Sequence, residues 1–364
     1  MGAPKRPATR APPHASPSAN PLDWWSVADL CSSVKSAVGQ GPLAVGVAPP
    51  GNGTDRRAAI NAASVPSPSN AAWDSRPWRD TRTLLRTRYN CLPTADRLRF
   101  CKGPSAAWAA GGLCPLCRQP DSAGHLLGGC SRLAMRKQVV KRHNQAVLLV
   151  HRAVARGSLT VALATCDTCP AADLPEGVHA TRPPPWVVPC PPSPPGVRAR
   201  SWRPDLLYIS APARPGPADE AAVKALRVSV ASGLTEPSPD VLARLRSDFV
   251  VHVVELGFFS ESGSGWLETL EYKRTQQSPL VAALQEAGWA NVRSRVVPLG
   301  SAGTIFAEVS ATLAALGVAV PSASALMRSL HFLAARTATA LLSSRYKLLR
   351  AARPSSRPLP PDPP

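Results

Sequence analysis

The chain has 364 residues, a length that suits two or three domains, or one domain with tails. Its 42 lysines and arginines outnumber its 23 aspartates and glutamates. The net charge of +19 favours a polyanionic partner, DNA or RNA, although a compositional bias toward Arg, Ala and Pro contributes to it. No apolar run of about 18 residues or more occurs, so we expect no transmembrane helix and no membrane partner.

The N-terminal part of the chain is expected to have little regular structure. Residues 1–75 are rich in proline, glycine, serine and asparagine and begin with a basic tail, so we predict a largely disordered region. A helical linker should follow within residues 76–132. Its arginines suit contact with nucleic-acid phosphates, although a solvated basic face explains them equally well. They are Arg79, Arg82, Arg86, Arg88, Arg97 and Arg99.

The most informative motif of this region combines cysteines with one histidine in the spacing C-x2-C-x7-H-x4-C. The residues are Cys114, Cys117, His125 and Cys130. Three thiolates and one imidazole can close a tetrahedron around a structural zinc ion. Nine cysteines, an odd number, and no apolar N-terminal signal segment also favour metal ligation over disulfides. We therefore predict a zinc knuckle, a module that often contacts nucleic acid.

A second zinc site is a weaker alternative, because its residues are widely spaced in a Pro-rich stretch. It would use Cys166, Cys169, His179 and Cys190.

The pattern of helices and strands expected over residues 133–350 predicts one α/β domain with a central mixed sheet flanked by helices. A Pro-rich linker over about 181–198, which should be extended or disordered, and a possible insertion over 212–240 interrupt it, and a disordered tail follows over 351–364. Periodicity predicts helices at 133–156, 266–287, 304–316 and 322–350. Strands are expected at 206–209, 225–231, 249–254 and 292–299, which gives the order β-β-β-α-β-α-α after the linker.

Three polar residues of this domain have the chemistry needed for phosphodiester hydrolysis. Asp205 precedes a predicted strand, Glu255 ends the strongest one, and Lys273 lies on the next helix. Two carboxylates on neighbouring strands can hold Mg²⁺, and a lysine can orient water and stabilise developing negative charge. In the simplest arrangement the lysine lies two residues after the second acid, where this chain has Gly257. The long separation of the two acids leaves Asp248 as an alternative to Glu255.

Short motifs follow one another along about residues 80–350. In chain order they are Leu92-Pro93-Thr94, the cysteine-histidine motif, Arg142-His143-Asn144, Arg203-Pro204-Asp205, Glu255-Leu256-Gly257-Phe258-Phe259-Ser260-Glu261, Lys273-Arg274-Thr275-Gln276-Gln277 and Val296-Val297-Pro298-Leu299-Gly300. This order, more than any one motif, resembles the C-terminal part of non-LTR retrotransposon proteins. Those proteins carry a zinc knuckle and a restriction-like endonuclease of the PD-(D/E)xK type.

The resemblance implies a nuclear, Mg²⁺-dependent endonuclease that nicks target DNA, whose free 3′ end then primes reverse transcription. Asp205, Glu255 and Lys273 match the catalytic positions, with the lysine displaced onto a helix. His143 matches a position near the active site, and an ordinary surface or core histidine is its alternative. Arg142 and the arginines of the helical linker would join the knuckle in holding nucleic acid.

The same resemblance implies further partners, namely the element RNA and a reverse transcriptase acting in trans, because the chain has no Tyr-x-Asp-Asp polymerase motif. Two alternatives remain open at this point. One is a catalytically inactive nucleic-acid-binding module from a truncated retroelement, and the other is a mostly disordered relic.

Overall fold

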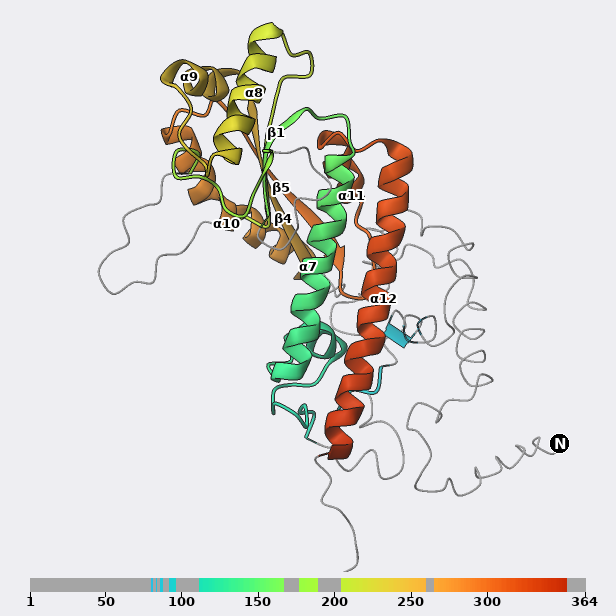
Figure 1. The fold of residues 1–364 in the computed structure, drawn as a ribbon. Helices are drawn as coiled ribbons and strands as arrows, with labels where there is room; N and C mark the ends of the chain where they lie inside the picture. Colours follow the sequence, from blue (N-terminus) through green and yellow to red (C-terminus); the bar gives the residue numbers. More distant parts are fainter. Residues whose placement is uncertain are drawn as a thin grey trace, which may run out of the picture. The chain divides into compact units, whose positions relative to one another are not determined.

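The computed structural model (Figure 1) describes residues 80, 83, 86–87, 92–95, 111–166, 177–188, 204–259 and 265–351. All of them belong to one compact unit, Pro50–Pro364. The regions predicted to be disordered, residues 1–75 and nearly all of 351–364, lie outside the described residues.

A mixed sheet of five strands lies at the centre of the described fold, as predicted for an α/β domain. The strands lie in the order β2-β1-β3-β4-β5. β3 is antiparallel to β1 and to β4, whereas β5 is parallel to β4 and β2 is parallel to β1. The strands are β1 (Val161–Thr165), β2 (His179–Ala180), β3 (Leu206–Ser210), β4 (Val250–Phe259) and β5 (Asn291–Gly300).

Helices cover both faces of this sheet (Figure 1). On one face lie α7 (Leu133–Ala155), α11 (Ala307–Ala315) and α12 (Val320–Ala351), and on the other lie α8 (Pro217–Ala231), α9 (Pro239–Asp248) and α10 (Gly265–Glu286). Side chains alternate along a strand, so β3 sends Leu206 and Tyr208 into the first core and Leu207 and Ile209 into the second. No described helix is both long and apolar enough to cross a membrane.

Residues 225–231 form the end of helix α8, so the prediction of a strand there is wrong. The start of α8 explains the difference. Pro217 is the first helical residue, and the Asp219 carboxylate accepts a hydrogen bond from the Gly216 N–H at 2.8 Å, which caps the helix. The predicted element order is therefore also wrong. From β3 onward the chain runs β3-α8-α9-β4-α10-β5-α11-α12, and the stretch between β3 and β4 is helical.

The sequence does not predict β1 or β2, because β1 is short and alanine-rich and β2 has only two residues. Part of the predicted extended linker also packs into the fold. Trp186, Val187 and Val188 are buried in the second core, and the Trp186 indole N–H donates to the Leu234 carbonyl at 3.2 Å. The prediction of an extended linker is therefore wrong for these three residues.

Candidate functional site

The pairing of β3 with β4 brings Asp205 and Glu255 together. Leu206 is paired with Val254, so Asp205, one residue before β3, lies beside Glu255. The Asp205 N–H donates to Glu255 Oε1 at 3.3 Å, and the Leu256 N–H donates to Asp205 Oδ2 at 2.7 Å. Glu255 lies within β4 and not at its end, because the strand continues to Phe259. A backbone N–H of β4 and one just before β3 thus contact the two carboxylates.

Two helices add a histidine and a lysine to these carboxylates. His143 of α7 places Nε2 2.9 Å from Asp205 Oδ1, and Lys273 of α10 places Nζ 3.1 Å from Glu255 Oε2. The helices come from opposite faces of the sheet. We call these four residues the carboxylate network. The structure therefore brings together all four residues that the sequence proposes for catalysis.

Exposure and charge differ across the carboxylate network. The Glu255 side chain is 7% exposed, whereas the side chains of Asp205, Lys273 and His143 are 19%, 25% and 32% exposed. Burial raises the pKa of Glu255, and the negative charge of Asp205 raises it further. The hydrogen bond to Asp205 raises the pKa of His143, although burial opposes this change. Two acids held this close favour the binding of a cation or a proton.

A lysine reaches Glu255 from α10, whereas position 257 of β4 holds a glycine. A Cβ atom built on Gly257 would lie 2.5 Å from Cζ of Phe259, which is much closer than van der Waals contact. The Phe259 ring is itself buried against Leu270 and other core residues. A lysine at position 257 would therefore collide with packed core, and the cation reaches Glu255 from α10 instead.

Asp248, the alternative to Glu255, lies elsewhere in the fold. It is the last residue of α9, and its carboxylate lies 3.4 Å from the Arg244 guanidinium. Arg244 also pairs with Asp219 at 2.8 Å and so connects α9 to the start of α8. The pairing in the sheet thus selects Glu255 as the neighbour of Asp205.

The predicted zinc ligands also lie together. They form what we call the Cys3His cluster: Cys114, Cys117, His125 and Cys130, whose ligand atoms all lie within 4.8 Å of one another. Cys117 Sγ lies 3.8 Å from Cys130 Sγ and 3.2 Å from His125 Nε2. Tetrahedral zinc with bonds of about 2.3 Å to sulfur separates two thiolates by about 3.8 Å. The cluster could therefore bind a metal ion such as zinc.

Local backbone structure prepares the Cys3His cluster. The Arg118 N–H donates to the Cys114 carbonyl at 2.8 Å, which closes a turn around the first two cysteines. Gly112, just before this turn, has φ +65°, a conformation that favours glycine. Burial raises the pKa of the Cys130 thiol to about 12, so metal binding at neutral pH must release its proton.

A buried ion pair joins α12 to the segment that carries the Cys3His cluster, which we call the knuckle. The Asp121 carboxylate, between the second and third ligands, accepts hydrogen bonds from both terminal nitrogens of Arg345, with Nη1 at 2.7 Å from Oδ1. It also accepts the Ala95 N–H at 2.7 Å. Sequence reasoning misses this pair. The sequence does contain one sign of it. Arg345 lies four residues after Leu341 and therefore on the apolar face of α12, where a buried charge needs a partner of opposite charge.

The other predicted sites are only partly described. Arg86 and Arg142 are buried, and the Arg142 guanidinium lies 4.1 Å from the centre of the Phe258 ring. Five of the predicted phosphate ligands lie outside the described residues: Arg79, Arg82, Arg88, Arg97 and Arg99. The role of all seven arginines in binding nucleic acid stays a prediction.

The alternative second zinc site is also only partly visible. Cys166 is buried in the first core, whereas Cys169 and Cys190 lie outside the described residues. Within the described ranges, the Cys3His cluster is the only group of three or more metal-ligating side chains close enough to share one ion.

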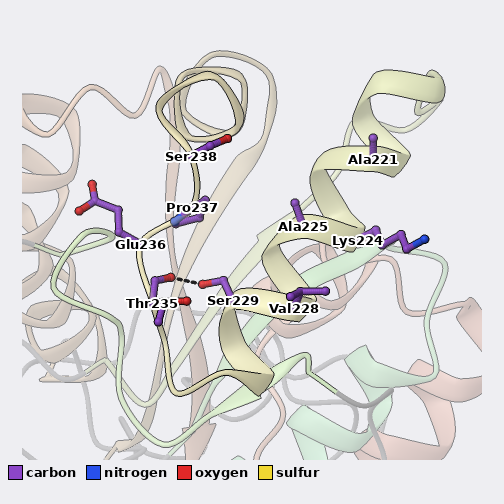
Figure 2. A pocket seen from close by; sticks show the side chains of 9 residues that line it. All are labelled: Ala221, Lys224, Ala225, Val228, Ser229, Thr235, Glu236, Pro237 and Ser238. Atoms are coloured by element: carbon purple, nitrogen blue, oxygen red, sulfur yellow. Dashed lines mark hydrogen bonds between the residues drawn. The ribbon is translucent and has the colours of Figure 1, made fainter.

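A hollow of about 510 Å³ between α8 and the loop that follows it lacks the features of a ligand site (Figure 2). The Ser229 hydroxyl donates to the Thr235 carbonyl across it. Lys224 and Glu236 are its only charged lining residues, and Figure 2 shows them on opposite sides, pointing away from each other. Binding sites usually combine an apolar cavity with convergent polar groups, which this hollow does not have.

Comparison with known proteins assigns no family to this chain. No protein-family model matches the sequence, and a search of curated proteins finds no match. Its function is therefore inferred from the residues and contacts described above.

Proposed function

We propose that this chain is a metal-dependent DNA endonuclease that nicks target DNA for retrotransposon integration, and that its zinc knuckle binds nucleic acid. The observation that carries this proposal is the carboxylate network. Two acids from adjacent strands contact each other through the backbone, and one of them contacts a lysine at 3.1 Å. Acids and a lysine in such an arrangement suit the hydrolysis of a phosphodiester.

The arrangement of elements supports a restriction-endonuclease-like fold for this proposal. Helix α7 precedes the antiparallel strands β1, β3 and β4, and helix α10 then leads to β5, which is parallel to β4. Asp205 comes just before the second of these antiparallel strands and Glu255 lies in the third. A central mixed sheet flanked by helices is the architecture that the resemblance to restriction-like endonucleases implies.

The carboxylate network also fits a hard divalent cation such as Mg²⁺. Each carboxylate has about four lone-pair sites, and the contacts made by Asp205 and Glu255 leave some of them free for a metal. Mg²⁺ binds through one or two carboxylates and keeps several waters, so two acids suffice. A cation here would also relieve the repulsion that raises the pKa of Glu255. The bound metal would activate water and polarise the scissile phosphate.

The remaining residues have roles that follow from their charge and position. Lys273 is a partly exposed cation next to Glu255, so it can orient the attacking water and stabilise the extra negative charge on the phosphate. His143 holds Asp205 on the side opposite the β4 backbone, and its raised pKa favours the charged imidazolium. It is therefore a positioning residue for the Asp205 carboxylate.

A plasmid-nicking assay with Mg²⁺ tests the proposal directly. We expect the parent chain to relax supercoiled plasmid and Asp205→Ala to reduce the rate at least a hundredfold, because a metal ligand is lost. Salt-dependent DNA binding should change little. Asp248→Ala is the matched control, because it removes an acid outside the carboxylate network. Equal nicking by the Asp205→Ala variant would reject the site.

The alternative function is a catalytically inactive module that only binds nucleic acid. The net charge of +19 and the Cys3His cluster favour it, because both would persist after loss of catalysis. DNA binding without nicking by the parent chain would support this alternative. Either function is consistent with a location in the nucleus, which we propose on the same grounds.

A further inference from the structure

Helices α7 and α12 form a groove of about 520 Å³ between them, which we call the α7–α12 groove. Its apolar lining consists of Leu148, Leu149, Phe332, Leu333 and Ala340, and its polar lining includes Gln138, Gln145, Ser329 and Thr337. Three cations, Lys141, Arg142 and Arg336, complete the lining, and no acidic residue takes part in it.

The charge of the two helices makes this groove selective for anions. Together α7 and α12 contain 55 residues, 23 and 32, without a single aspartate or glutamate. Both Lys141 and Arg336 are exposed. No ion pair between described residues involves either of them, so their charges are not neutralised within the described structure. A polyanion is the ligand that such a groove attracts.

The groove is a different surface from the carboxylate network. His143 lies two residues from both Lys141 and Gln145, and side chains two apart on a helix do not face each other. Only Arg142 connects the two regions, since it lines the groove and places its guanidinium over Phe258, three residues after Glu255. A ligand in the groove therefore leaves the network open.

We propose that the α7–α12 groove binds single-stranded DNA. A duplex presents mainly phosphates at its surface and would leave the apolar lining unused. A single strand satisfies both parts of the groove, because its phosphates can contact Lys141 and Arg336 while a base stacks on the half-buried ring of Phe332. DNA is chosen over RNA because the proposed function has this chain act on DNA.

Fluorescence anisotropy with a labelled oligothymidine and no divalent metal tests this site by binding alone, so a failure of the nuclease proposal would not affect the result. We expect the double variant Lys141→Glu/Arg336→Glu to weaken binding about tenfold or more. The plot of log affinity against log salt should become shallower by about 1.4, since each single-strand phosphate contact contributes about 0.7. Phe332→Ala should weaken binding roughly tenfold while leaving the salt dependence unchanged.

Arg328→Glu is the matched control, because Arg328 is an exposed arginine of α12 that does not line the groove. We expect it to retain nearly all of the affinity, and thermal melting should be similar in the charge variants because the substituted side chains are exposed. If Arg328→Glu weakens DNA binding as much as Arg336→Glu does, the groove is not the binding site, and DNA binds instead to a diffuse basic surface. Tighter binding of RNA or of duplex DNA of the same length would overturn the choice of single-stranded DNA.

Discussion

Asp205 makes three polar contacts, one with α7 and two with neighbouring residues of β4. Its Oδ2 accepts the Leu256 N–H of β4, its Oδ1 lies 2.9 Å from His143 of α7, and its own N–H donates to Glu255. The first two contacts restrict the carboxylate, one through each oxygen, and the third restricts the backbone of Asp205. A residue just outside a strand is therefore held by the strand beside it and by a helix.

His143 should make the stability of the protein depend on pH. The hydrogen bond to Asp205 raises its pKa in the folded state. The protonated imidazole therefore stabilises the fold fully below its unfolded pKa of about 6.5, and this stabilisation is lost as the pH rises through the folded pKa. We expect His143→Ala to reduce the free energy of unfolding more at about pH 5.5 than at about pH 8.5, measured by urea denaturation.

The pairing with Asp205 supplies the control for this experiment. In a background of Asp205→Asn the neutral amide no longer favours the charged imidazole, so the effect of His143→Ala should become almost independent of pH. If His143→Ala lowers the free energy of unfolding equally at both pH values in the parent background, the contact between His143 and Asp205 provides no electrostatic stabilisation.

At the scale of elements, α12 connects the knuckle to the sheet. Leu326 and Leu330 pack into the first core near one end of this helix, and Arg345 binds Asp121 of the knuckle near the other. Both members of this ion pair are almost fully buried, with 2% of the Arg345 side chain and none of the Asp121 side chain exposed. Such a pair fixes one orientation, because loss of either partner leaves a buried charge.

Asp121→Ala should therefore destabilise the fold by about 3–5 kcal/mol, because it leaves the Arg345 guanidinium buried without its carboxylate. Chemical denaturation of the variant and the parent measures this difference. Glu286→Ala, which removes an exposed acid at the end of α10, should change stability by less than about 0.5 kcal/mol. A similarly small effect of Asp121→Ala would mean that the ion pair does not hold the knuckle on α12.

At the scale of the whole molecule, the knuckle and the α/β sheet belong to one compact unit. The π-helical turn η2 (His125–Gly129), which carries the histidine of the Cys3His cluster, contacts both α7 and α12. Two residues of this turn, Leu126 and Leu127, are buried. The described fold should therefore respond to metal binding as a whole, and not through the knuckle alone.

Removal of zinc should lower the melting temperature of the entire unit in a single transition, because a ligand that binds only the folded state stabilises that state. Cys117→Ser should release zinc, lower the melting temperature similarly, and weaken nucleic-acid binding. Differential scanning calorimetry with and without a zinc chelator, together with metal analysis, measures both effects. Two separate transitions would show that the knuckle folds independently, and unchanged zinc content in Cys117→Ser would reject it as a ligand.

Features that depend on near neighbours in the chain could be predicted from the sequence alone. The members of the Cys3His cluster fall within 17 residues, Cys114 to Cys130, and the periodicity of α7 and the β-branched run of β4 are equally local. The sequence also identified the four members of the carboxylate network, through a resemblance in motif order. The prediction from sequence failed at residues 225–231. The alternation of apolar and polar residues there favours a strand, whereas the capped start of α8 favours a helix.

Which distant residues meet depends on the tertiary structure. The register of β3 and β4 places Asp205 beside Glu255 across 50 residues, the Phe259 ring excludes a side chain at Gly257, and Arg345 reaches Asp121 across 224 residues. Local preferences cannot specify such contacts, because they arise from the packing of sheet faces and helices after the chain has folded. The members of the Cys3His cluster, which are close in sequence, could therefore be predicted from their spacing, whereas the neighbours of each carboxylate depended on the fold.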